Sequence, residues 1–345
     1  MDAARRASTD GRRSAPRPGA AIIEAPRAPR PDAATFDAAR RALRDAAADV
    51  PHTDADGLAA GAIALRARGE RAGDAVLLGR GETPFAADAP LPDGPLAILD
   101  WGVRPIDRPA LLVDHHAFDT DAAGAAVTVV SSFGEDPEVP TAPLMRRIVP
   151  DAPAWLAAVG GVGDAGDAAF ALPECAGAPK TAVRKLVPLV NAPRRLPDGP
   201  VRTALALLTE HDDPKHALAD PRIAELHQAK AAWRAEFDRV VRTAPDVSAR
   251  LAVLRFSTPA QVHPLVATAW ARRLAPRVVL AANDDYLPGR VNFAVRGGVP
   301  GQDLRALLRS ALPEQGGEFA HGHPRATGGS LEPPAFERLL AALSS

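Results

Sequence analysis

The chain has 345 residues, of which 46% are hydrophobic, which is enough for two domains with packed cores and excludes a disordered protein. The formal net charge of -1 excludes nucleic-acid binding through bulk positive charge, and 4% aromatic residues argue against a long stacking platform for single strands. Cys175 is the only cysteine, which excludes a disulfide framework and a thiolate metal site and suits a reducing cytoplasm. We find neither a secretory signal nor an apolar run long enough to cross a bilayer, so we expect a cytoplasmic protein with no membrane partner.

The chain begins with a segment, residues 1–33, that mixes Arg, Ala, Pro and Ser without apolar periodicity. We expect this segment to be a disordered tail. The pattern then predicts a helix over 34–48 and a short strand that ends at Pro51. Residues 51–69 are predicted to form a loop followed by a helix of small and apolar residues.

Three apolar runs come next and are predicted strands, at 74–81, 95–102 and 110–116. Residues 124–133 fit either a helix or a buried strand. A helix predicted over 154–163 ends in a Gly-rich turn. Strands that alternate with helices predict an α/β fold with a parallel, doubly wound sheet and helices on both faces. In such sheets ligands bind beyond the carboxyl ends of the strands.

The second half of the chain follows a Pro-rich break at 191–200. Two helices are predicted there, at 201–210 and 223–241, and the second carries an apolar stripe formed by Ile223, Leu226, Trp233, Phe237, Val240 and Val241. A second, smaller α/β unit starts near residue 250. Its expected elements are strands at 251–256, 277–283 and 290–297, helices at 263–275, 303–312 and 333–343, a turn at 284–289 and a loop at 320–329.

Carboxylate and imidazole side chains gather where the strands of the first unit end. Because side chains alternate along an extended segment, the segment H-x-D-x-D-G after the first strand can turn its three polar side chains toward one site. Two further apolar runs also end in such residues, and one more carboxylate lies in the Gly-rich turn. The set is His52, Asp54, Asp56, Asp100, Asp114, His115, His116 and Asp164.

A cluster of this composition favours divalent cations. So many carboxylates would repel one another in an empty pocket, and cations remove that repulsion. Oxygen and nitrogen ligands without sulfur suit Mn²⁺ or Mg²⁺, with Zn²⁺ or Fe²⁺ as alternatives. One metal rarely needs six protein ligands, so two metals that share a carboxylate fit better. Metal pairs about 3.5–4 Å apart commonly serve in-line displacement at phosphorus.

Each part of this set also has an ordinary structural explanation. Asp54 and Asp56 could cap a helix, Asp100 could cap the next element and Asp164 could be a turn residue. Two adjacent histidines also occur in ordinary loops. The occurrence of all four groups in order, each at a strand end or in a following turn, favours a metal centre.

The motifs PHTDADG, ILDWG, VDHHAFD and GGVGDAG resemble, in order and spacing, those of the DHH phosphoesterases, the superfamily of RecJ-type nucleases and nanoRNases. In the second unit, VNFAVRG and HGHPRATGG are similar to the DHH-associated C-terminal domain, whose hallmark is a glycine run that ends in histidine. The resemblance covers residues 35–345.

This resemblance implies a role for each residue of the cluster. Asp100 would bridge two metals, His116 would lie beside the scissile phosphate to orient it or assist proton transfer, and Asp114 would fix a histidine or the loop. The implied ligand sets are His52, Asp54 and Asp100 for one metal, and Asp56, Asp100, His115 and Asp164 for the other.

In the second unit the resemblance implies that Arg296 and His323 contact substrate phosphate. A Gly-rich turn can aim backbone N–H groups at an anion, and Arg or His adds charge; an ordinary surface turn is the alternative. His321 stands where the family usually has a further glycine, so a detailed substrate preference does not transfer. The glycines that would allow close backbone approach are Gly322, Gly328 and Gly329.

The function implied is a metal-dependent phosphodiesterase for short single-stranded oligonucleotides or linear dinucleotides, with two divalent cations, Mn²⁺ before Mg²⁺. Few aromatics and little net charge favour short substrates over long ones. The alternatives are a RecJ-type single-strand exonuclease and a cyclic-dinucleotide or phosphomonoester hydrolase. A non-enzymatic nucleotide-binding regulator is disfavoured by the intact ligand set. A homodimer is left open.

The corresponding domain division has four parts: a disordered tail (1–33), a DHH metal-binding catalytic domain (34–200), a helical connector (201–247) and a DHH-associated substrate-binding domain (248–345).

Some residues mimic functional ones. His211 and His216 lie in the connector, away from any strand end, and we expect a solvated loop there. His263, before Pro264, is expected to start a helix. The Arg pairs at 146–147, 194–195 and 272–273 are expected to form solvated faces.

Overall fold

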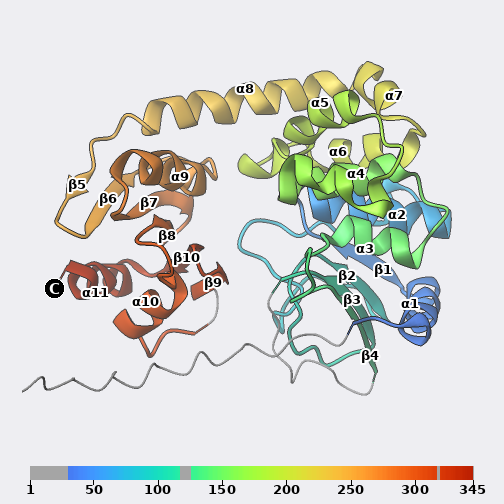
Figure 1. Cartoon of the computed structure of the whole chain (residues 1–345), viewed down its shortest axis with the longest axis horizontal. Helices are drawn as coiled ribbons and strands as arrows, with labels where there is room; N and C mark the ends of the chain where they lie inside the picture. Colours follow the sequence, from blue (N-terminus) through green and yellow to red (C-terminus); the bar gives the residue numbers. More distant parts are fainter. Residues whose placement is uncertain (1–29, 117–125, 317–318, 345) are drawn as a thin grey trace, which may run out of the picture.

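The computed structural model describes residues 30–116, 126–316 and 319–344. These form two α/β units joined by one long helix, α8 (Ile223–Val240), which runs along the top of Figure 1. The expected fold, with a parallel N-terminal sheet and a second α/β unit, is confirmed. None of the helices in the described part of the chain is both long and apolar enough to cross a membrane.

The first unit, residues 33–219, is built on four parallel strands in the order β1-β2-β3-β4. Every residue of the first three strands is buried, as is typical of parallel strands covered on both faces. Residues 124–133, which fitted a helix or a strand, contain a strand. The bounds are β1 (Ala48–Pro51), β2 (Leu96–Leu99), β3 (Ala110–Asp114) and β4 (Val127–Ser131).

Helices cover one face of this sheet. Residues 55–65 of the second helix are all buried, and their small side chains let this helix lie close to its neighbours. Asp54 caps its start, and Gly69 ends it in the left-handed conformation, with φ 72°. The helices are α1 (Ala33–Asp45), α2 (Ala55–Arg68), η1 (Ala72–Asp74), α3 (Thr141–Ile148), α4 (Ala154–Ala165), η3 (Gly166–Ala171), η4 (Pro173–Cys175), α5 (Lys180–Val190), η5 (Pro193–Arg195), α6 (Val201–Glu210) and α7 (Pro214–Ala219).

In the described residues, the other face of the sheet packs against the irregular parts of the segment 75–109, so the expectation of helices on both faces is wrong. Leu78 of this segment lies in one buried cluster with residues of β1, β2 and β3. The strand expected at 74–81 is therefore wrong: beyond η1 the segment is irregular, although Val76 N donates to Asp49 O. Its apolar run reflects burial against the sheet, which periodicity alone does not distinguish from strand pairing.

The second unit, residues 246–344, has a mixed sheet in the order β5-β6-β7-β8-β10-β9. Side chains alternate along its strands, so Phe293 and Val295 enter one core while Ala294 enters the core on the opposite face. The elements are β5 (Asp246–Val247), β6 (Leu251–Phe256), α9 (His263–Leu274), β7 (Val278–Leu287), β8 (Arg290–Gly297), α10 (Leu304–Ala311), β9 (Phe319–His323), β10 (Ala326–Leu331) and α11 (Pro333–Ser344).

Two glycine-rich segments are regular structure. The loop expected at 320–329 belongs to strands β9 and β10, and the Gly-rich turn expected after residue 159 lies largely inside α4. In α4 the glycines serve close packing: a Cβ on Gly160 would stand 2.3 Å from Asp56 Oδ1. Glycine was interpreted as a turn signal, but here it marks close approach between elements.

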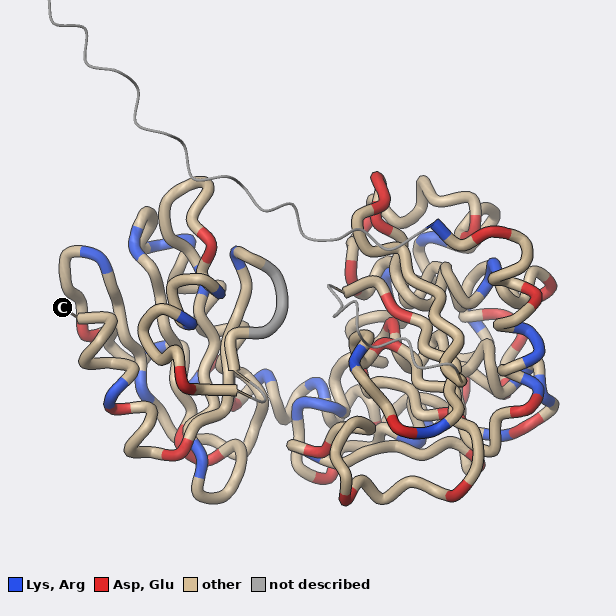
Figure 2. Tube along the Cα trace, turned by 90° about the horizontal axis from the view of Figure 1, so that it is seen from below, with Lys and Arg blue, Asp and Glu red and all other residues tan. Residues whose placement is uncertain are grey.

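The connector packs on both units. Leu226 of α8 belongs to the core of the first unit and Val240 to a core of the second. Leu205 of α6 and Ala217 of α7 also lie in the first core. The first core therefore continues past residue 200, and the domain division remains a prediction. Figure 2 shows basic and acidic residues interspersed over both units.

Candidate metal centre

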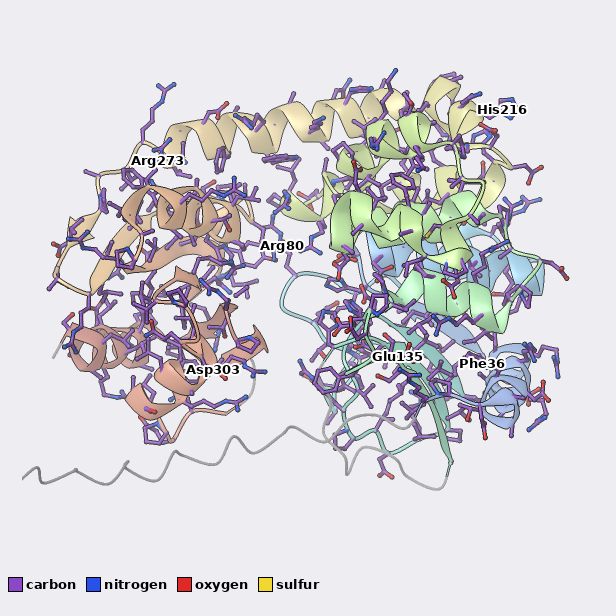
Figure 3. The ribbon with its side chains drawn as sticks, in the orientation of Figure 1. Phe36, Arg80, Glu135, His216, Arg273 and Asp303 are labelled. Atoms are coloured by element: carbon purple, nitrogen blue, oxygen red, sulfur yellow. The ribbon has the colours of Figure 1, made fainter. Side chains whose placement is uncertain are left out.

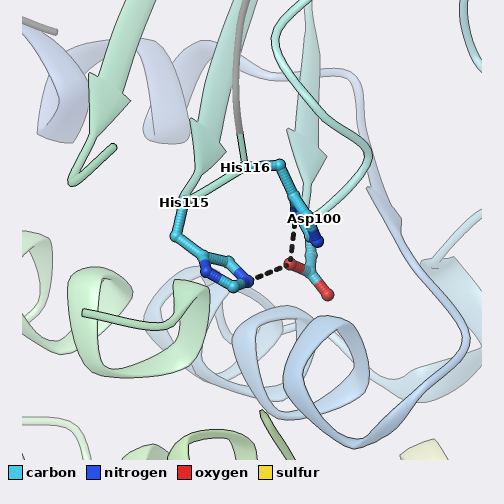
Figure 4. Close-up of side chains that lie close together, drawn as sticks. All are labelled: Asp100, His115 and His116. Atoms are coloured by element: carbon cyan, nitrogen blue, oxygen red, sulfur yellow. Dashed lines mark ion pairs between the residues drawn. The ribbon is translucent and has the colours of Figure 1, made fainter. Parts of the chain in front are cut away.

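The polar residues that follow three strands of the first sheet meet at one edge. His52 follows β1, Asp100 follows β2, and Asp114 is the last residue of β3. Because the strands are parallel, their carboxyl ends present these residues on the same side. The imidazoles of His115 and His116 lie beside Asp100 (Figure 4).

Asp100 lies at the centre of this cluster. Its backbone has φ 70°, a left-handed conformation that is uncommon for residues other than Gly and that clusters at functional sites. The carboxylate is 3.6 Å from Nε2 of His115 and 3.8 Å from Nδ1 of His52. It also accepts a 2.8 Å hydrogen bond from the Thr141 hydroxyl. Asp100 thus touches both halves of the predicted ligand set.

The side-chain geometry groups the candidate ligands. Within the described residues, three sets of side chains bring their potential ligand atoms within 4.8 Å of one another, and Asp100 belongs to two sets. Two of the three fall inside the ligand sets expected from the sequence. The sets are His52, Asp54 and Asp100; Asp56, His115 and Asp164; and Asp100, His115 and His116.

Asp54 is both a helix cap and a member of the cluster. Its Oδ1 accepts a 3.0 Å hydrogen bond from Gly57 N. Its Oδ2 accepts a 2.7 Å bond from Arg194 and lies 3.0 Å from His52 Nδ1. Burial by itself raises the pKa of Asp54, but His52 and Arg194 hold it well below its usual range. The carboxylate is therefore ionised, as a metal ligand must be.

Asp56 lies in the first turn of α2 and is buried. Its oxygens accept the backbone N–H groups of Thr141 and Ala142, at 2.7 and 2.8 Å, where the N-terminus of α3 favours negative charge. Burial is the main cause that raises the pKa of Asp56 to about 7. Gly160 of α4 leaves the space that this carboxylate occupies.

His115 is buried and held between carboxylates. Its Nδ1 lies 3.0 Å from Glu138 Oε1, and its Nε2 lies 3.1 Å from Asp164 Oδ2 without forming an aligned hydrogen bond. Burial lowers the pKa of His115, but Asp164 and Glu138 together raise it to about 12. A histidine with one nitrogen on a carboxylate and the other facing ligand groups is typical of metal sites.

Asp114 orients His116. Its Oδ1 accepts a 2.5 Å hydrogen bond from His116 N and lies 3.1 Å from Nδ1 of the same residue, while its Oδ2 accepts a 2.6 Å bond from Gly102 N. Burial raises the pKa of Asp114, but the hydrogen bond with His116 lowers it overall. The side chain of His116 is 37% exposed, whereas that of His115 is 3% exposed, so His116 faces outward from the cluster.

The donor set fits divalent cations. Nδ1 of His52 and Nε2 of His115 are buried without a hydrogen-bond partner, although carboxylates lie close to both. Burial, then the charges of neighbouring carboxylates, raise the pKa of Asp100 well above its usual range. A cation would give the two nitrogens a partner and offset the repulsion among the carboxylates. Oxygen and imidazole donors without sulfur suit Mn²⁺ or Mg²⁺.

A pocket of about 230 Å³ opens beside His52, and both units line it. Arg80, in the segment that faces the second unit (Figure 3), donates a 2.6 Å hydrogen bond to Pro259 O. Its guanidinium carbon lies 4.6 Å from the centre of the Tyr286 ring. Other lining residues are Trp101, Arg194, Leu196 and Gln261.

Two of the three Arg pairs are engaged in contacts, so their assignment to solvated faces is wrong. Arg194 binds Asp54, and Arg195 donates to Gln261 O at 3.1 Å. The pair at 146–147 is also tied to neighbouring groups, whereas the pair at 272–273 is exposed as expected. Charge patterning identified the pairs, but only long-range packing decides which ones reach a partner.

The predicted phosphate contacts of the second unit remain predictions. The guanidinium of Arg296 donates to the carbonyls of Val295 and Thr327. Gly328 is required by the sheet, since a Cβ there would stand 2.2 Å from Phe293 O. The side chains of residues 321–323, which include His321, Gly322 and His323, lie outside the described part of the structure. Gly328 and Gly329 line a second pocket.

Glu138, Thr141 and Arg194 were missed as site residues. Thr141 follows a proline at a helix start, a weak sign of a polar cap, whereas nothing in the sequence links Glu138 to a histidine 23 positions away. His263 begins α9 as expected. The solvated loop expected at His211 and His216 is wrong in part: His216 lies in α7, and His211 pairs with Asp220 at 2.9 Å. The last three residues of the third motif, Ala117 to Asp119, could not be placed, because residues 117–125 lie outside the described residues.

Comparison with solved structures identifies the fold. A structure of exonuclease RecJ bound to manganese matches with a TM-score of 0.58 at 20% identity, covering 90% of this chain and 93% of that chain. RecJ from Thermus thermophilus in complex with Mn²⁺ matches with a TM-score of 0.63 at 21% identity. That match covers 90% of this chain and 53% of the RecJ chain. The DHH domain of a member of the s1p family of ribosomal proteins matches with a TM-score of 0.58 at 14% identity, covering 90% and 88%.

No protein-family model and no curated protein sequence matches the chain. The structural likeness nevertheless confirms the fold of the DHH phosphoesterases, which the four motifs predicted.

Proposed function

We propose that this chain is a metal-dependent phosphodiesterase that hydrolyses short oligonucleotides or linear dinucleotides. The observation that carries the proposal is the convergence of carboxylates on His52 and His115, whose inward nitrogens are buried and make no hydrogen bond. Structural packing does not require such an arrangement, and a pair of divalent cations explains it. The DHH fold and the manganese-bound RecJ structures support the same chemistry.

In this proposal the ligands form two sets that share Asp100. His52, Asp54 and Asp100 would hold one cation, and Asp56, Asp100, His115 and Asp164 the other. The cations, when bound, would activate water and stabilise charge on the phosphoryl oxygens. Arg194 keeps Asp54 ionised, and Glu138 orients His115. His116, held by Asp114, would contact the scissile phosphate from the exposed side of the cluster.

The pocket beside His52 supports a small substrate. Its volume is about 230 Å³, and Arg80 and Arg194 line it together with Glu82, so its wall offers guanidinium donors suited to a phosphate group. A single-strand exonuclease is the second candidate, because the chain matches 93% of the length of a RecJ structure.

A Mn²⁺ assay with end-labelled RNA and DNA oligonucleotides of graded length tests both candidates. Short-substrate specificity predicts that kcat/KM is highest for two to about five nucleotides, the span expected for one small pocket and its surroundings. An exonuclease would instead act equally or better on long strands. Asp100→Asn, which preserves side-chain size, should lose both bound Mn²⁺ and turnover. Wild-type protein that binds no divalent metal and hydrolyses no phosphoester would refute the proposed function.

A further inference from the structure

A second pocket, of about 270 Å³, adjoins the one beside the metal centre. The two pockets share Gly81 and Tyr286 in their linings, so they lie on either side of the same wall. The second pocket is bounded by the segment around Gly81 from the first unit and by strands β7, β8 and β10 from the second. A molecule bound beside His52 therefore lies next to the second pocket.

Asn292 lines this second pocket and has an unpaired polar atom. The residue is 6% exposed, and its Oδ1 is buried without a hydrogen-bond partner. Asn283, which pairs with it in register on β7, is fully satisfied: its Oδ1 accepts from Thr258 N at 3.1 Å and its Nδ2 donates to Ala260 O at 3.1 Å. A buried amide oxygen left unpaired is costly, so the Asn292 amide would gain a partner by turning toward a ligand in this pocket.

The character of the two pockets differs. Arginines border the pocket beside His52, whereas every residue that lines the second pocket is uncharged. Phosphate therefore belongs in the former, and a neutral polar ring suits the latter. The Tyr286 ring, which Arg80 holds from the first unit, supplies an aromatic surface, and Gly328 and Gly329 supply a stretch of strand without side chains.

We propose that the second pocket binds a nucleobase of the substrate and that Asn292 is a specificity-determining residue, whose side-chain amide turns toward the base and forms a hydrogen bond with its edge. This inference rests on the proposed function and deepens it. The phosphodiester lies at the metal centre and the neighbouring base lies against Tyr286, so the enzyme reads one nucleotide beyond the cleaved bond.

Two kinds of substrate separate base binding from chemistry. The dinucleotides ApA, GpG, CpC and UpU carry bases, whereas bis(p-nitrophenyl) phosphate carries none and reports on the metal centre alone. In Asn292→Ala the ratio of kcat/KM for dinucleotides to kcat/KM for the baseless ester should fall roughly two- to tenfold, mainly through KM, as expected for one lost hydrogen bond. Ser310→Ala, an exposed change on α10, should keep the wild-type ratio.

The outcomes are distinct. A ratio unchanged in Asn292→Ala, or an equal loss on both kinds of substrate, overturns the inference while leaving the phosphodiesterase intact. If Asn292→Ala does not fold by circular dichroism, Tyr286→Leu, which removes the shared aromatic wall, should lower the same ratio, and an unchanged ratio there overturns the inference as well.

If the wild type hydrolyses no phosphoester, the proposed function fails and the pocket is tested by binding alone. Calorimetric titration with AMP, GMP, CMP and UMP should then show weaker binding to Asn292→Ala than to wild type. Equal affinities, or no binding to either protein, overturn the inference.

Discussion

Nδ1 of His115 lies 3.0 Å from Oε1 of Glu138, and this pairing leaves Nε2 to face Asp164, Asp100 and Asp56. The two residues lie on different loops at the edge of the first sheet. A carboxylate that holds one imidazole nitrogen selects the tautomer and increases the basicity of the other nitrogen. The Glu138–His115 contact therefore prepares His115 to be a ligand.

Removing this support should weaken metal binding. Glu138→Ala is expected to lower Mn²⁺ affinity roughly 10- to 100-fold, the usual effect of losing a carboxylate behind a ligating histidine. Calorimetric titration of metal-free protein with Mn²⁺ measures the change. Glu135→Ala is the matched control, because Glu135 lies on the same loop but pairs with Arg147. Equal losses in the two variants would contradict a specific role for Glu138.

His116 should separate chemistry from metal binding. Its side chain is 37% exposed and is oriented by Asp114, so His116→Ala is expected to keep the bound Mn²⁺ of the wild type. Turnover should fall roughly 100-fold or more, as expected for a group that contacts the reacting phosphate. Metal content and kcat are measured on the same preparation. Because His116 also forms a potential ligand set with Asp100 and His115, loss of metal in this variant would make it a ligand instead.

Gly160 should be intolerant of a methyl group. In an ordinary helix interior, Gly→Ala is stabilising by about 0.5–1 kcal/mol. At Gly160 the added Cβ would meet Asp56 Oδ1 at 2.3 Å and Ala142 Cβ at 2.4 Å, so we expect Gly160→Ala to lose roughly 1–3 kcal/mol of stability and to weaken Mn²⁺ binding. Urea denaturation and Mn²⁺ titration test this.

Gly73→Ala is the control for that change, because nothing lies within 4 Å of a Cβ at position 73 and its φ is not positive. A Gly160→Ala protein as stable as Gly73→Ala, with wild-type metal affinity, would show that α4 does not constrain Asp56.

Asp49 should make stability depend on pH. It is fully buried in β1, its oxygens make no hydrogen bond, and Arg68 Nη1 is 3.6 Å away. Burial raises the pKa of Asp49 to about 7, against the usual value of 3.8. The folded protein therefore keeps this proton where the unfolded chain has lost it. For that reason the free energy of unfolding falls as pH rises from about 4 to about 7.

Asp49→Asn should remove this part of the pH dependence. The variant is expected to be more stable than wild type at pH 8, by no more than about 4 kcal/mol for a shift of about three pKa units, and closer to wild type at pH 4. Urea denaturation of metal-free protein at both pH values measures the difference. Asp45→Asn, an exposed change at the end of α1, controls for the lost charge. A difference of the same size at both pH values would contradict the assignment.

The sequence predicted most helices and strands of the fold, but not which segments pack against one another. Strands β2 and β3 and helices α2, α8 and α9 follow from short-range periodicity and capping, which act within a few residues. The segment 74–81 was mistaken for a strand because an apolar run that covers a sheet looks like one that joins it. The glycines of α4 were mistaken for a turn because residues that they pack against, such as Asp56 for Gly160, are distant in the chain.

What the sequence alone determined is the set of candidate ligands. Residue type and position after apolar strands identified His52, Asp54, Asp100 and His115, because ligands need particular donor atoms and parallel sheets bring strand ends together. Only the tertiary structure decided how those donors are held. Glu138 behind His115, Arg194 on Asp54 and the unpaired Asn292 beside a second pocket all depend on contacts between distant segments, and such contacts leave no local pattern in a chain.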